Sequence, residues 1–173
     1  MTLRCTRKLL AALRARPATN PAPGRSILGD WYANIYDTQP CRLVLCVNER
    51  SLLPVLLEFQ ETSALMRSLE RSVADLLARI GVPEDSILLE RAAMAGMQLG
   101  ATANRRILGC LNETAFAISH AFDWMHPKYF RDHEDHLSRF IYSPTGYRPP
   151  HALARELFEA ASPGPRSKLA PIH

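Results

Sequence analysis

Residues 31–59 read WYANIYDTQPCRLVLCVNERSLLPVLLEF, and this stretch decides the fold. It contains three apolar runs with strand character, 31–37, 41–48 and 51–59, and short polar turns separate them. Connections this short join antiparallel neighbours, so the stretch predicts an antiparallel β-meander. The middle run is apolar on both faces, which is typical of a central strand. Pro54 indicates that the third run lies at an edge of the sheet or is bulged.

Apolar spacing and turn residues predict the remaining elements: a strand and a helix within 3–16, helices over 62–80, 83–95 and 104–122, and a strand over 97–102. This order of strands and helices is typical of an α+β fold. We therefore expect residues 1–122 to form an α+β domain, in which the meander packs against several helices.

The composition changes after residue 122. Residues 123–150 are rich in aromatic residues, His and Pro, and Pro149 and Pro150 precede one short predicted helix at 151–161. The tail that follows has the composition of a disordered terminus. Residues 123–173 are therefore interpreted as a C-terminal extension.

Size and composition indicate a soluble globular protein: 173 residues, 47% hydrophobic and 22% charged, with no apolar run long enough to span a bilayer. Arg and Ala are abundant, which favours a bacterial origin over an organellar transit peptide. The four cysteines form no CxxC pair, so reduced thiols in the cytoplasm are expected rather than a thiolate zinc site.

Basic residues are concentrated near the N-terminus, where residues 1–29 contain no acidic residue. The candidates for contact with nucleic acid are Arg4, Arg7, Lys8, Arg14 and Arg16. Phosphate contacts of this kind would supply affinity without sequence specificity. The alternative interpretation is a solvated first helix.

Three short polar motifs, 29–34, 47–51 and 104–112, are the candidate functional segments. The hairpin turns would bring Asp30, Trp31, Asn48 and Glu49 to one end of the sheet, with Asn34 one pleat deeper.

The third motif opens a predicted helix at Asn104. At about 100° per residue, Arg105 and Asn112 align beside the apolar stripe, and Gly109 between them would let another backbone approach. A half-buried Arg and Asn need partners, because an unpaired buried donor costs about 1–3 kcal/mol. The motif residues are then either a structural network that joins helix to sheet, or a site with an anion anchor, amide groups and a carboxylate base.

The sequence supplies no strong catalytic or metal motif. It lacks a Walker loop, a dinucleotide-binding glycine pattern, a GxSxG elbow and an EF-hand loop. His133 and His136 lie in an HEDH run without HExxH spacing, so a solvated charged helix is favoured over a metal site. We expect no metal and no cofactor.

Four segments carry a resemblance to a known family: CTRKL (5–9), GDWYAN (29–34), VNERSLLPV (47–55) and the pattern NRxxLGxxN (104–112). In this order they resemble a family of small bacterial proteins classified only as a domain of unknown function, over about residues 1–120. The family more often has NRSVLGSMND at the last motif, from which Arg106, Ile107, Cys110, Leu111 and Glu113 depart. The resemblance implies that the basic N-terminus belongs to the folded domain, and it implies no activity.

The leading hypothesis is a non-catalytic binding or regulatory module with a polar Asn/Asp/Arg site. One alternative is a small, toxin-like hydrolase or nuclease with Glu49 or Asp30 as the base and Arg105 stabilising the developing anion. The other is a nucleic-acid binder that uses the basic N-terminus. The partner is a protein or a nucleic acid in these hypotheses, and no membrane is involved.

Overall fold

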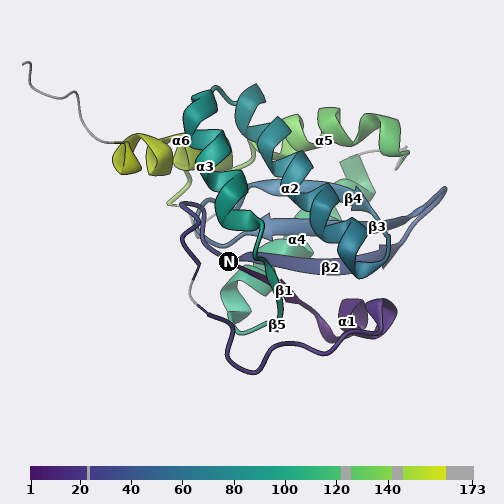
Figure 1. The fold of residues 1–173 in the computed structure, drawn as a ribbon. Helices are drawn as coiled ribbons and strands as arrows, with labels where there is room; N and C mark the ends of the chain where they lie inside the picture. Colours follow the sequence, from purple (N-terminus) through teal and green to yellow (C-terminus); the bar gives the residue numbers. More distant parts are fainter. Residues whose placement is uncertain (23, 122–125, 142–145, 163–173) are drawn as a thin grey trace, which may run out of the picture.

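The computed structural model describes residues 1–22, 24–121, 126–141 and 146–162 (Figure 1). The strands are β1 (Thr2–Cys5), β2 (Trp31–Asp37), β3 (Arg42–Asn48), β4 (Pro54–Glu58) and β5 (Gln98–Ala101). The helices are α1 (Arg7–Leu13), α2 (Thr62–Arg79), α3 (Glu84–Met94), α4 (Arg105–Ala121), α5 (Phe130–Leu137) and α6 (Pro150–Ala161), with a 3-10 turn, η1 (Pro127–Tyr129). These elements confirm the α+β class.

One sheet holds all five strands, in the order β4-β3-β2-β1-β5. The β2-β3-β4 meander is antiparallel as predicted, with Trp31 opposite Asn48, and β4 is an edge strand as Pro54 indicated. However, β1 runs parallel to both β2 and β5, so the sheet is mixed and the prediction of an antiparallel meander alone was wrong. The reason is the long connection through α1, which provides the crossover that a parallel pair needs.

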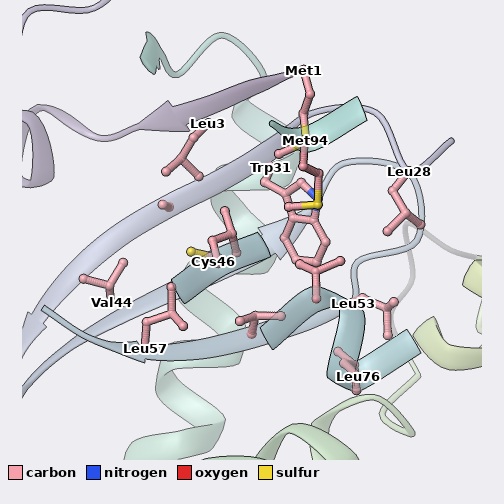
Figure 2. Close-up of a cluster of buried hydrophobic side chains, with 14 of the residues drawn as sticks. Met1, Leu3, Leu28, Trp31, Val44, Cys46, Leu53, Leu57, Leu76 and Met94 are labelled. Carbon is pink, nitrogen blue, oxygen red and sulfur yellow. The ribbon is translucent and has the colours of Figure 1, made fainter. Parts of the chain in front are cut away.

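Alternate residues of β2 face opposite sides of the sheet. Trp31, Ala33 and Ile35 belong to the larger core cluster, which α2 and α3 cover (Figure 1). Trp31 is fully buried there, with Met1, Met94 and Leu53 around it (Figure 2). Tyr32 belongs to the second cluster, on the face that α4 covers.

The segment after residue 125 contributes to both core clusters. It holds η1, α5 and α6, whereas the sequence predicted one short helix. Phe130 and Leu137 of α5 are buried in the second cluster, and Ala154 and Phe158 of α6 in the larger one. The predicted disordered tail begins at Ser162, whose backbone N–H donates to Phe158 at the end of α6; the rest of that tail, from residue 163 onward, lies outside the described residues. Among the described helices, none combines the length and apolar character needed to cross a membrane.

Candidate functional site

A polar cluster lies at the end of the sheet where β2 begins. The Asp30 carboxylate accepts a hydrogen bond from the backbone N–H of Thr2 at 2.8 Å and another from Nε of Arg4 at 2.8 Å. The side chains of Arg4 and Asp30 are 23% and 18% exposed. Asp30 is therefore engaged in fastening the first residues of the chain to the rest of the sheet.

Tyr32 is the buried centre of this cluster, and the sequence analysis missed it. Burial raises the pKa of Tyr32, and the negative charge of Glu49 raises it further, while Arg4 and a backbone hydrogen bond of Asn104 lower it. The hydroxyl thus lies among groups from β1, the β3–β4 turn and the start of α4. The parallel register opposes Arg4 to Tyr32, so only knowledge of the β1–β2 pairing would have revealed this centre.

Asn48 is fully buried and its hydrogen bonds are all structural. Its Nδ2 donates to the carbonyl oxygens of Leu28 at 3.0 Å and Asp30 at 3.3 Å. Its Oδ1 accepts from the backbone N–H of Ser51 at 2.9 Å and that of Arg50 at 3.1 Å. Asn48 therefore closes the β3–β4 turn onto the chain that precedes β2, and its amide is not available to a ligand.

Asn34 and Asn104 support helix starts. Oδ1 of Asn34 accepts from the Thr6 hydroxyl at 2.6 Å, and the Thr6 oxygen accepts from the backbone N–H of Leu9 at 3.3 Å in the first turn of α1. Oδ1 of Asn104 accepts from the backbone N–H of Arg106 at 3.0 Å, which caps α4. Trp31, another predicted site residue, is a core side chain instead.

Arg105 and Asn112 are exposed, so the prediction that they flank the apolar stripe half-buried was wrong. The buried residues of α4 are Ile107, Cys110, Leu111, Thr114 and Ile118. This buried stripe is centred near residues 107 and 114. The sequence pattern had predicted a stripe rotated toward Ala115. At 100° per residue, Arg105, Gly109 and Asn112 then lie on the opposite side of the helix.

The predicted site therefore divides in two. Asp30, Glu49 and Asn104 gather with Arg4 around Tyr32, as the convergence of motifs predicted. Arg105 and Asn112 point away from that cluster into solvent.

The basic N-terminal residues are partly neutralised. Arg4 is paired with Asp30, and Nζ of Lys8 lies 3.0 Å from Oδ2 of Asp37. Arg7, Arg14 and Arg16 are exposed, and they form no ion pair within the described residues. Three of the five nucleic-acid candidates thus remain as free surface cations.

The buried thiols are poor nucleophiles. Burial raises the pKa of Cys5 to about 12 and raises that of Cys46 well above its ordinary value. A thiolate is the reactive form, so both side chains behave as small apolar residues. The described residues contain no group of three His, Cys, Asp or Glu side chains arranged to hold a metal ion.

A second polar cluster joins α5 to α2 and β4. His133 and Glu134 are buried, so the interpretation of residues 133–136 as a solvated helix was wrong. The Glu134 side chain is 4% exposed; Oε1 accepts from the backbone N–H of Leu56 at 2.9 Å, and Oε2 lies 2.7 Å from Nη2 of Arg79. Burial raises the pKa of Glu134 to about 7, although the Leu56 N–H and Arg79 both act to lower it.

The fold and these clusters define a small α+β domain with a mixed sheet and no recognisable catalytic constellation among its described residues. The model of one family, described as a domain of unknown function (DUF6933), matches residues 2–153, and the chain belongs to this family. The match runs past residue 120, where the sequence motifs had placed its limit, and includes α5.

No curated protein matches the chain significantly. Among solved structures, a chain in the cryo-EM structure of the simian T-cell lymphotropic virus intasome in complex with PP2A regulatory subunit B56 gamma is similar, with 13% identity and a TM-score of 0.41. The similarity covers 92% of this chain and 65% of that chain. A likeness at this level carries no argument about fold or function.

Proposed function

We propose that this protein is a non-catalytic binding module, and that the outer face of α4 is the surface that contacts a partner protein. Arg105, Gly109, Asn112 and Phe116 form this face, and we call them the α4 outer row. The observation that carries the proposal is that all four residues are exposed, although three of them belong to the polar motif at 104–112. Residues with no structural task inside the chain are free for an external contact.

Gly109 supports this proposal most directly. A glycine in a helix interior costs about 1 kcal/mol relative to alanine. A Cβ atom at Gly109 would meet nothing within 4 Å, so packing within the chain does not require glycine there. Its absent side chain would instead allow the backbone of a partner to approach α4 closely.

Phe116 and Arg105 provide the contact groups of the row. Phe116 is 64% exposed, and the centroid of its ring lies 3.9 Å from the centroid of the His120 ring. Arg105 forms no ion pair within the described part of the chain. Exposed aromatic and arginine side chains are typical of the residues that dominate protein–protein binding energy. Small-molecule sites are concave, whereas a helix face is convex, which favours a protein as the partner.

The surroundings of the proposed bases favour binding over catalysis. The Asp30 carboxylate is occupied by Arg4 and the Thr2 N–H. Arg105, which the nuclease hypothesis assigns to the developing anion, lies on the exposed side of α4, whereas Glu49 acts on the buried Tyr32. The nuclease hypothesis requires the general base and the anion-stabilising group to lie at one reacting centre.

A site-specific photo-crosslinker tests the proposal in the native host. It is placed at Asn112 in the row, and at Leu89 of α3 as a matched control, since Leu89 is 68% exposed and remote in sequence. We expect a discrete protein adduct from position 112, absent from position 89 and lost when Phe116→Ala is added. Leu89→Ala should leave the adduct intact. An adduct that persists in Phe116→Ala, or an adduct with RNA or DNA in place of protein, would contradict the proposal.

A further inference from the structure

The β4 strand is an edge of the sheet, partly covered by α5, and its backbone groups can be assigned to its two sides. The N–H of Phe59 donates to the carbonyl of Arg42 at 2.8 Å. Hydrogen-bonded and non-hydrogen-bonded pairs alternate along an antiparallel ladder. Every second residue of β4 therefore turns its N–H and C=O toward β3, and Pro54, Leu56 and Glu58 turn theirs outward.

Two of these three outward positions are blocked. Pro54 has no N–H, and the N–H of Leu56 is bonded to Oε1 of Glu134. The N–H and C=O of Glu58 and the C=O of Leu56 have no hydrogen-bond partner within the described residues. Glu58 is thus the outward residue with both backbone groups open, and it could exchange both hydrogen bonds with one residue of an added strand.

A pocket of about 370 Å³ opens beside this part of the edge. Its walls include Leu57 and Glu58 of β4, Arg71 and Ser72 of α2, and Phe130 and Arg131 of α5. This volume falls within the range of ligand sites in proteins. The pocket therefore brings unpaired backbone groups, hydroxyl and guanidinium groups and an aromatic ring together in one open depression.

On its α2 side the pocket presents the guanidinium of Arg71, and on its β4 side the carboxylate of Glu58, which forms no ion pair within the described residues. Asp75 is paired with Arg79 and lies 2.8 Å from Nη2 of Arg131, and Glu134 is paired with Arg79. Arg71 is exposed and forms no ion pair within the part of the chain described. Arg71 is thus the cation of the pocket that lacks a counter-charge, and a carboxylate is its strongest hydrogen-bond partner.

We propose that this pocket binds an extended peptide segment of a partner protein, which pairs with Glu58 at the open edge of β4 and places an acidic side chain on Arg71. Main-chain hydrogen bonds to the edge supply affinity, and the side chains on either side of the strand supply specificity. The peptide site uses no residue of the α4 outer row, so its test is independent of the function proposed above.

The test is an ¹⁵N NMR titration of the full chain with the capped tripeptide acetyl-Val-Glu-Val-N-methylamide. We expect saturable shifts of the Glu58 amide and of Arg71 Nε. Arg71→Ala, and the peptide with Gln in place of Glu, should each weaken binding by about tenfold through loss of the charge-assisted contact. Arg67→Ala is the matched control, because Arg67 is exposed on α2 and does not line the pocket; it should bind like the unmodified protein.

A second pair of variants separates backbone pairing from the charge of Glu58. Glu58→Pro removes the outward N–H without a ladder bond to lose, whereas Glu58→Ala removes the carboxylate and keeps the N–H. We expect peptide binding to be lost in the first variant and kept in the second, with both proteins folded by circular dichroism. Equal binding by both variants, no shifts at Glu58 up to the solubility limit of the peptide, or pairing of β4 with β4 of a second copy in place of peptide would overturn the proposal.

Discussion

Lowering the pH from about 8 to about 5 should stabilise the folded protein through a single carboxyl group, that of Glu134. Glu134 is enclosed by α2, β4 and its own helix, and burial raises its pKa from 4.5 to about 7. The folded state therefore holds a proton that the unfolded state releases between these two values. For an acid whose pKa is raised on folding, the contribution to stability is fully present below the unfolded pKa and is lost as the pH rises through the folded pKa.

The size of the effect follows from the shift. A change from 4.5 to about 7 corresponds to about 3 kcal/mol at about 1.4 kcal/mol per pKa unit. Between about pH 5 and about pH 8 the free energy of unfolding should fall by about 2–3 kcal/mol from this group. Arg79 attracts the carboxylate but also binds Asp75 and Asp135, so its charge is shared. Because the charge of Arg79 is shared, burial raises the pKa of Glu134 by more than the attraction of Arg79 lowers it.

The assay is urea denaturation across this pH range for the unmodified protein and for Glu134→Gln. The glutamine keeps an acceptor for the Leu56 N–H and carries no titratable proton, so the difference in free energy of unfolding between the two proteins should change by about 2–3 kcal/mol across the range. Glu113→Gln, at an exposed carboxyl on α4, is the matched control substitution. Parallel curves for the unmodified protein and Glu134→Gln would refute the reasoning.

Three further predictions concern stability and reactivity. Asn48→Ala should lower the free energy of unfolding by about 2–3 kcal/mol, because it leaves backbone N–H groups of the β3–β4 turn without an acceptor. The exposed Asn112→Ala should change the free energy of unfolding by less than about 0.5 kcal/mol in the same denaturation assay. Similar losses in the two variants would contradict the structural role of Asn48. Gly109→Ala should raise stability by about 1 kcal/mol, seen as a higher denaturation midpoint, yet weaken partner binding if a backbone approaches there. Cys5 and Cys46 should react with iodoacetamide only after unfolding, as followed by mass spectrometry, and labelling of the folded protein at either position would disprove their burial.

The meander was predictable because its signals are local. Alternation along β2, the doubly apolar β3 and Pro54 in β4 each depend on residues within one strand or one turn, and the register of Trp31 opposite Asn48 follows from the hairpin. The position of β1 was not predictable in this way. Its pairing with β2 and β5 depends on crossovers through α1, α2 and α3, and no local pattern specifies which strand a crossover returns to.

The candidate site was predicted in part, for the same reason. Asp30, Trp31, Asn48 and Glu49 were correctly brought to one end of the sheet, because the hairpin turns fix that end. Tyr32 was missed as its centre because its neighbour Arg4 comes from the unpredicted parallel pair. On α4 the error was one of rotation: the sequence offers apolar residues at 110 and 115 on either side of the stripe, and packing against β2 and β3 buries Cys110.

The rotation of α4 separates the polar residues with structural roles from those that are exposed on the helix. The side-chain amides of Asn34 and Asn48 join α1 and the β3–β4 turn to the sheet, whereas that of Asn104 caps the first turn of α4, a helix that packs on β2 and β3. A helix held in this way presents its outer residues in one orientation and loses little conformational entropy when a partner binds, which favours affinity. Arg105 and Phe116 are exposed on this helix, and under the proposed function they are the side chains that contact the partner.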